Sequence, residues 1–343
     1  MSWTLEVNNK LFYDKIKAIK EHNISGGAIK FNTPKNYDNF DFSVEPKESL
    51  ENLCLQNIKD IRHKHEAVHL WYSGGCDSHY ILELCLQNKI IIDKIIMVKS
   101  GYKNADFEIS EYAIPFILKT NVQYEVRMPD QKYYTDFYIN KNIKEPTQNN
   151  FWHHYRLNNH FENLKNETNN VANIFGKEKT KLCYVDNKWY TYFLDIEVTH
   201  QPNQINFFCD DPIIYCKQGH MVKKAIEQNF DAKDYNAITN YNEHQNFWNR
   251  AMGRYSECTF PLKDINTDKH INNKDQMAIN EADKVLLEAW KDRNQKLKED
   301  VGKHWFNKQD PAFGTIGIFS NFFGLNENVI KTVDELFPDG YKI

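Results

Sequence analysis

Residues 67–78 read AVHLWYSGGCDS, and this stretch decides the fold. Its first six residues have the length and the apolar content of a short buried strand. A polar turn with two glycines follows. Asp77 and Ser78 then open a segment whose apolar residues, Ile81, Leu84 and Cys85, share one helical face. The sequence therefore predicts a strand, a tight turn and a helix in direct succession.

The turn has the composition of a phosphate-binding loop. A glycine-rich turn between a strand and a helix presents backbone N–H groups at the positive end of the helix dipole, where phosphate oxygens are best received. Gly74 and Gly75 permit a close approach, while Ser73 and Ser78 can donate from their hydroxyls. Asp77 can hold Mg²⁺ or accept backbone hydrogen bonds that fix the loop. An ordinary strand-to-helix turn is the alternative interpretation.

Further strands and helices are expected on both sides of this stretch. Apolar residues at helical spacing over 50–63 predict a helix that leads into the strand, and another helix is expected from residue 106 toward 119, bent near Pro115. The expected strands are 67–72, 90–99, 122–128 and 171–175, the last closed by Gly176. Because helices and strands alternate, we expect an α/β fold with a doubly wound parallel sheet.

The pattern changes after the fourth expected strand. Residues 182–185 and 189–193 flank the polar link Asp186-Asn187-Lys188, which predicts a small antiparallel hairpin. From Lys217 onward the chain reads as mainly helical, most clearly over 276–297. We expect an N-terminal helical preface over 1–66, an α/β domain with the hairpin over 67–215, and a mainly helical C-terminal region over 216–343.

The bulk composition narrows the class of protein. The chain has 343 residues and a formal net charge of −4, from 43 basic and 47 acidic residues, so the average surface does not predict a polyanion binder. Its seven cysteines are scattered without a C-x-x-C pair, which argues against a disulfide framework and a zinc ribbon. The sequence has no cationic apolar leader and no run of about eighteen apolar residues. We therefore expect a cytoplasmic protein that does not cross a membrane.

The motif Ser-Gly-Gly-x-Asp-Ser at 73–78 resembles the signature of the PP-loop, or N-type ATP pyrophosphatase, family of the adenine-nucleotide α-hydrolase fold. The resemblance extends from about residue 67 to 175. It implies a five-stranded parallel sheet, ATP and Mg²⁺ as cosubstrates, and adenine lying against the end of the second strand. Cys76 occupies the variable position, so it is given a main-chain role. The nucleotide-binding residues implied or placed beside this site are Ser73, Gly74, Gly75, Cys76, Asp77, Ser78, Met97, Val98, Gly101 and Tyr102.

The resemblance also implies a reaction. In such enzymes a substrate oxygen attacks the α phosphorus of ATP, pyrophosphate leaves, and an amine, ammonia or sulfur nucleophile then displaces AMP. Electrostatic positioning does most of this work. The sequence thus predicts an ATP-dependent ligase whose acceptor is a small molecule, a nucleotide or a nucleic-acid base. Which acceptor it is, and the oligomeric state, cannot be read from the sequence.

Features that are missing around the loop exclude several branches of the family. Residue two is Ser2 rather than a cysteine nucleophile, and only about seventy residues precede the loop, which argues against a glutamine-hydrolysing asparagine synthetase. Paired catalytic cysteines and a cysteine zinc cluster are also missing. A sulfonucleotide reductase using Cys258 is the first alternative, and a catalytically silent nucleotide-binding module is the second. The loop and the segments 176–179 and 217–220 are similar to PP-loop proteins of tailed phages, which would place the protein in a host cytoplasm.

Two groups of cations are candidates for phosphate contacts. Lys177 and Lys179 follow an expected parallel strand, so they would emerge on the same carboxyl edge as the loop, although a solvated charged turn explains them equally well. Lys217 and His220 start an expected helix, and a lysine from the helical region completes phosphate binding in relatives of asparagine synthetase. A surface or capping histidine is the alternative for His220. The expected catalytic residues are Asp77, Lys177 and Lys217.

The remaining clusters have plainer explanations. Asp210-Asp211 reads as a turn and helix entry rather than an Mg²⁺ site. His153, His154 and His160 lie among aromatic residues that favour a packing surface over a metal site. The aromatic residues of 189–193 favour a packed sheet over a base-stacking surface. Tyr102 either borders the substrate or is a loop aromatic.

Overall fold

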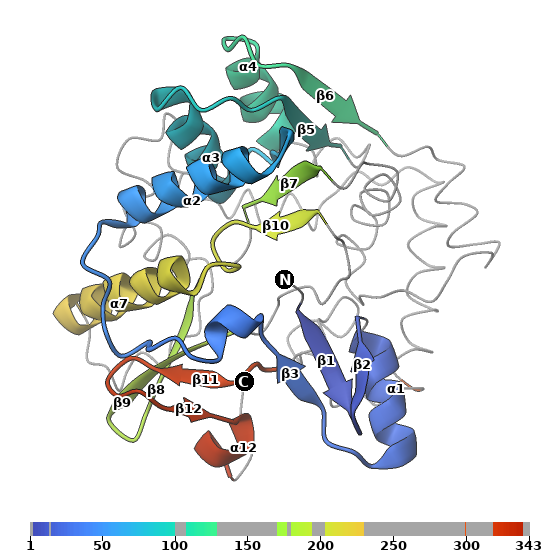
Figure 1. Cartoon of the computed structure of the whole chain (residues 1–343), viewed down its shortest axis with the longest axis vertical. Coiled ribbons are helices and arrows are strands. Elements are labelled where there is room, and N and C mark those ends of the chain that lie inside the picture. Colours follow the sequence, from blue (N-terminus) through green and yellow to red (C-terminus); the bar gives the residue numbers. More distant parts are fainter. Residues whose placement is uncertain are drawn as a thin grey trace.

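The structure is a computed structural model that describes residues 3–13, 15–99, 108–128, 170–176, 180–193, 203–229, 299 and 318–338. These residues form three sheets of five, four and three strands, with helices packed on them (Figure 1).

The five-stranded sheet is parallel throughout and has the strand order β10-β7-β4-β5-β6. Trp71 at the end of β4 is in register with Phe175 on one side and Ile96 on the other, so the carboxyl ends of the three central strands lie together. The predicted α/β class with a parallel sheet is confirmed. The strands are β4 (Ala67–Trp71), β5 (Lys94–Val98), β6 (Tyr124–Arg127), β7 (Val171–Phe175) and β10 (Gln204–Asn206).

Figure 1 shows α2, α3 and α4 on the same side of this sheet. Side chains alternate along a strand, so Val68 and Leu70 of β4 join the large core beneath the helices. Trp71 belongs to a second buried cluster with Ile96, Val98 and Phe175 on the other face. The helical segments here are α2 (Leu50–Lys64), α3 (Cys76–Gln87), the π-helix η2 (Glu108–Ala113) and α4 (Ile114–Ile117).

The N-terminal preface differs from its prediction, because it contains a sheet as well as helices. Its antiparallel strands have the order β2-β1-β3, and Asn8 and Asn9 make the turn of the first hairpin with φ of 49° and 64°. The predicted helix over 50–63 is confirmed as α2. The other elements are β1 (Thr4–Val7), β2 (Lys10–Phe12), α1 (Lys15–Ser25), β3 (Lys30–Asn32) and the 3₁₀ turn η1 (Lys35–Tyr37).

The predicted hairpin is confirmed as β8 (Lys181–Val185) and β9 (Lys188–Tyr192). Its turn is shorter than predicted: Asp186 and Asn187 adopt φ of 51° and 61°, and Lys188 already belongs to β9. The aromatic residues Trp189, Tyr190, Tyr192 and Phe193 are buried, as expected for a packed sheet.

The described C-terminal stretch completes this sheet instead of continuing a helical region. Strand β11 (Phe322–Gly324) pairs with β9, and β12 (Ile330–Lys331) pairs with β11, giving the order β12-β11-β9-β8. The short helix α12 (Val333–Leu336) follows. The helix predicted over 276–297 lies outside the described residues.

Helix α7 (Pro212–Asn229) crosses the predicted domain boundary near residue 215. It starts earlier than expected, because proline fits the first helical position and Asp211 Oδ1 accepts the N–H of Ile213 at 3.1 Å. The helix-entry interpretation of Asp210-Asp211 is thereby confirmed. In the described part of the chain, no helix has the length and hydropathy needed to cross a membrane.

The N-terminal sheet is joined to the chain that precedes α7. Trp3 Nε1 donates to Asp210 Oδ1 at 2.8 Å, and Asn36 Nδ2 donates to the main-chain oxygen of Asp210 at 3.0 Å. The other carboxylate oxygen of Asp210 accepts the N–H of Asn206 at 2.8 Å. Burial raises the pKa of the Asp210 carboxyl above its ordinary value, against these hydrogen bonds.

Candidate functional site

The loop between β4 and α3 lies at the carboxyl edge of the parallel sheet. The strand continues one residue beyond Trp71, since Tyr72 donates its N–H to the main-chain oxygen of Ile96 at 2.8 Å. The chain then turns through Gly74, whose φ of +78° is in the left-handed region that glycine adopts without strain. Gly75 precedes the first residue of α3. The predicted strand, turn and helix are all present.

The two serines hydrogen-bond within the loop. The N–H of Ser73 donates to Ser78 Oγ at 3.2 Å, and the N–H of Gly75 donates to Ser73 Oγ at 3.2 Å. Ser78 Oγ lies 3.1 Å from the main-chain oxygen of Gly75, to which it donates, and its side chain is buried. A hydroxyl has a single proton to donate, so that of Ser78 closes the loop in this conformation. Its expected contact with phosphate stays a prediction. Ser73 is exposed.

The N-terminus of α3 has no side-chain cap. Its first helical hydrogen bond runs from the N–H of His79 to the main-chain oxygen of Gly75 at 3.0 Å. Gly75 has no side chain that could cap the N–H groups of residues 76–78. Helix α2, by contrast, is capped by Ser49, which accepts the N–H of Asn52. Because first-turn N–H groups have no acceptor inside their own helix, those of residues 76–78 form a positive end to α3. Cys76 and Asp77 are half-buried in this turn.

Gly176 brings the end of β7 against this loop. A Cβ on Gly176 would lie 2.7 Å from the Ser78 nitrogen and 2.9 Å from the Asp77 carbonyl carbon, so the two backbones are in direct contact. The chain after β7 therefore leaves the sheet beside the loop, as predicted. Lys177 and Lys179, which follow, lie outside the described residues.

The end of β5 is the expected place for adenine. Met97 is fully buried in the core beneath the helices, which leaves its main chain as the part near the sheet edge. Val98 has its side chain in the second cluster, together with Trp71 and Phe175. Gly101 and Tyr102 lie outside the described residues.

An aromatic and polar group at this edge was not predicted. Trp71 stacks on Phe175 with ring centroids 5.2 Å apart and planes 15° apart, and Arg127 Cζ lies 5.1 Å from the Trp71 ring. Trp71 Nε1 donates to Asn173 Oδ1 at 2.8 Å. The sequence signal was present, since Trp71 lies next to the end of one expected strand and Phe175 ends another, but their contact depends on the β4–β7 pairing.

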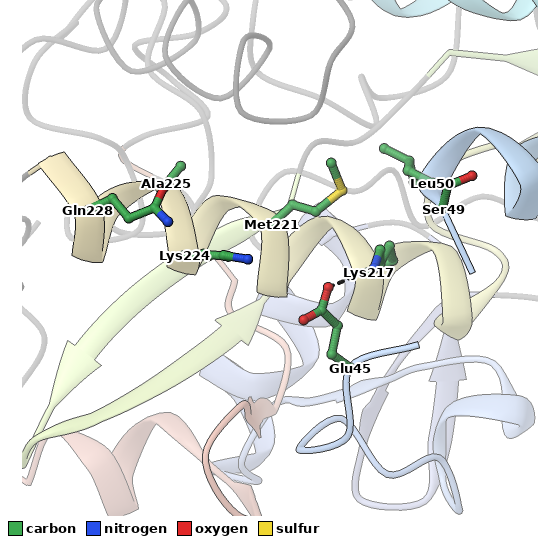
Figure 2. A pocket seen from close by; sticks show the side chains of 8 residues that line it. All are labelled: Glu45, Ser49, Leu50, Lys217, Met221, Lys224, Ala225 and Gln228. Atoms are coloured by element: carbon green, nitrogen blue, oxygen red, sulfur yellow. Dashed lines mark hydrogen bonds and ion pairs between the residues drawn. The ribbon is translucent and has the colours of Figure 1, made fainter. Parts of the chain in front are cut away.

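Lys217 lies in an open pocket of about 500 Å³ between the start of α2 and one face of α7 (Figure 2). Figure 2 shows its ammonium pointing to Glu45. Lys217 Nζ donates to Glu45 Oε1 at 2.6 Å and to the main-chain oxygen of Pro46 at 2.9 Å. The hydrogen bond from Lys217 holds the pKa of Glu45 below its ordinary value. Residues 73–78 do not line this pocket, so the structure does not bring Lys217 to the loop. Its catalytic role stays a prediction.

His220 lies inside α7 rather than at a helix start, and it is buried rather than exposed. Its Nε2 is 2.9 Å from the main-chain oxygen of Phe42, and burial lowers its pKa below the ordinary value. The surface or capping interpretation of His220 is therefore corrected. Its contact with Phe42 ties α7 to the segment between η1 and α2 and does not involve the loop.

In the part of the chain that the structure describes, no group of three or more His, Cys, Asp or Glu side chains could hold a metal ion. His153, His154, His160 and Cys258 lie outside the described residues.

Comparison with protein-family models finds no matching family, and comparison with curated proteins finds no match.

Proposed function

We propose that the chain is a PP-loop ATP pyrophosphatase-type enzyme with an adenine-nucleotide α-hydrolase-like fold, using Mg·ATP as a cosubstrate. The loop at 73–78 carries the proposal. It combines the Ser-Gly-Gly-x-Asp-Ser sequence with a left-handed Gly74, an uncapped helix N-terminus and a place at the carboxyl edge of a parallel sheet. Ligands of open α/β sheets bind at this edge.

In the proposed reaction an acceptor oxygen attacks the α phosphorus of ATP. The new oxygen–phosphorus bond forms as the bond to the β-phosphate oxygen breaks, and pyrophosphate leaves with that electron pair. The N–H groups opening α3 would receive the departing phosphates, which supports breaking this bond. Asp77, in the same turn, would orient the Mg·ATP substrate. An amine, ammonia or sulfur nucleophile would then displace AMP from the activated acceptor.

The decisive measurement is the pair of products formed from ATP. With Mg·ATP, an amine, ammonia or sulfur nucleophile, and a panel of acceptors bearing carboxylate or carbonyl oxygens, including nucleotides and nucleic-acid bases, we expect AMP and pyrophosphate in equal amounts. Release of ADP and phosphate would sink the proposal. Tight ATP binding without turnover on any acceptor would instead favour a silent nucleotide-binding module.

Asp77→Ala is the first variant to test. We expect it to abolish turnover. Its melting temperature and circular dichroism should stay close to those of the wild type, because the Asp77 side chain is only half-buried at the loop. Asp60→Ala, which removes an exposed aspartate of α2, is the matched control and should keep full activity. Full activity in Asp77→Ala would remove this residue from the site.

The sulfonucleotide reductase alternative shares the same loop. It predicts that Cys258→Ser is inactive and that thioredoxin supports turnover. Indifference of turnover to Cys258→Ser would dismiss it.

A further inference from the structure

Two buried polar side chains flank the phosphate loop. Tyr72 directly precedes Ser73, and His79 directly follows Ser78. Both are buried, with 1% and 0% of their surfaces exposed, and Tyr72 Oη lies 2.8 Å from His79 Nδ1. The loop is therefore flanked on both sides by buried residues, Tyr72 and His79, that are hydrogen-bonded to each other.

The surroundings hold this pair in place. Tyr72 is fixed in the sheet by its N–H bond to Ile96, and the N–H of His79 makes the first helical hydrogen bond of α3. Phe116 of α4 packs edge-on against the His79 ring at 4.7 Å. His79 Nε2 is 3.3 Å from Glu83 Oε1, one turn further along α3 and close enough for an ion pair if His79 is protonated.

We propose that the Tyr72–His79 pair positions the phosphate loop, by fixing the distance between the end of β4 and the start of α3 before a phosphate arrives. The inference rests on the proposed function for its effect on ATP. Its structural part concerns the loop alone. The serine hydrogen bonds across the loop form one closure, and the Tyr72–His79 hydrogen bond forms a second closure beneath it. A loop held in this way loses less conformational freedom when it binds.

The test compares variants that keep or remove this hydrogen bond. Tyr72→Phe removes the hydroxyl. His79→Gln places its amide near the Nε2 position, whereas His79→Asn places an acceptor near Nδ1 and can keep the bond. We expect Tyr72→Phe and His79→Gln to raise the Kd for ATP roughly tenfold and to raise KM to a matching extent. The kcat of both variants should stay within about twofold of the wild-type value. We expect His79→Asn to stay within about threefold of the wild type.

Tyr215→Phe is the matched control. It removes another buried tyrosine hydroxyl, which donates to the Tyr192 main-chain oxygen at 2.7 Å and accepts the N–H of Lys181 at 3.3 Å. Neither partner belongs to the loop. We expect it to lower the melting temperature about as much as Tyr72→Phe while leaving ATP affinity unchanged. Unchanged ATP affinity in Tyr72→Phe, or equal losses in both tyrosine variants, would overturn the inference.

Amide hydrogen exchange separates this inference from the proposed function. In protein without nucleotide, we expect Tyr72→Phe to speed the exchange of the Gly75 and His79 amides roughly tenfold, and Tyr215→Phe to leave it unchanged. If the wild type binds no ATP, the proposed function fails, and faster exchange still supports the positioning role. Unchanged exchange in Tyr72→Phe overturns that role whether or not ATP binds.

Discussion

Gly176 leaves no room for a side chain, because its backbone meets that of Asp77 and Ser78. Gly176→Ala would put a Cβ 2.7 Å from the Ser78 nitrogen, so β7 or the loop must move. We expect a loss of about 1–3 kcal/mol in the free energy of unfolding, as for other overpacked sites. We also expect at least a tenfold weaker affinity for ATP. Denaturant unfolding and calorimetric ATP titration measure the two effects, and wild-type affinity in a folded Gly176→Ala protein would contradict the described loop contact.

Lys217 and Glu45 offer a test of whether Lys217 is structural or catalytic. Since the hydrogen bond from Lys217 lowers the pKa of Glu45, Lys217→Ala should raise that pKa toward the ordinary glutamate value. NMR titration of the Glu45 carboxyl measures the shift. For turnover, Lys224→Ala is the control, because Lys224 lines the same pocket and is exposed. Turnover lost in Lys217→Ala but kept in Lys224→Ala would support the predicted catalytic role, and turnover kept in both would contradict it.

At the scale of single residues, the sequence predicts what is local. The glycines and the acidic residue of the loop stand within six positions, so their geometry follows from neighbours in the chain. The contact of Gly176 with the loop does not follow in this way. It depends on β4 and β7 being adjacent, and about a hundred residues separate these strands in the chain.

Helix α7 contains a glycine whose replacement by alanine should stabilise the fold. Gly219 lies inside the helix, where a Cβ would come 3.4 Å from the Leu325 methyl groups, an ordinary contact. Alanine loses less backbone entropy than glycine in a helix, so Gly219→Ala should stabilise the fold by up to about 1 kcal/mol. Urea unfolding measures the change. Destabilisation would mean that the Leu325 side chain cannot shift enough to accommodate the added Cβ.

Element length decides which strands the sequence could predict. Strand β7 was predicted with its observed bounds, because five consecutive residues end at a glycine. Strands β1, β3 and β10 have three or four residues, too few to establish a period of two. The prediction for β5 began four residues early because Ile90, Ile91 and Ile92 are apolar. The strand begins only at Lys94, and just before it the Asp93 carboxylate accepts the N–H of Val68 at 2.7 Å.

The hydrogen bonds of Asp210 connect parts of the molecule that are far apart in sequence, and they should respond to pH. Its folded-state pKa is raised, so protonation of Asp210 favours the folded state. This stability is fully present below the ordinary aspartate pKa of about 4 and is lost as pH rises through the raised value. As the pH falls from 7 to 4, the free energy of unfolding of the wild type should therefore rise relative to that of Asp210→Asn. The rise should be about 1.4 kcal/mol for each pH unit by which the folded state raises the Asp210 pKa. Chemical denaturation across this range measures the difference, and a constant difference would contradict the raised pKa.

At the scale of the molecule, the parallel sheet was predictable and the start of α7 was not. Alternating apolar segments around one motif predicted the sheet. The predicted boundary near 215 falls inside α7, because residues 212–216 read as apolar and hid the start of the helix. The C-terminal strands were missed because β11 pairs with β9, which lies more than 120 residues earlier in the chain, and β12 pairs in turn with β11.

The pairing of β9 with β11 also sets an order of events during synthesis. The ribosome delivers Thr191 long before Phe323, its partner in the sheet, and at roughly 5–20 residues per second the wait is on the order of ten seconds. Until then β9 has a neighbour on one side only, and its unpaired main-chain groups can pair with another nascent chain. A protein truncated before residue 322 would keep that exposed edge permanently, so expression of such fragments should yield aggregates even when the phosphate loop itself is intact.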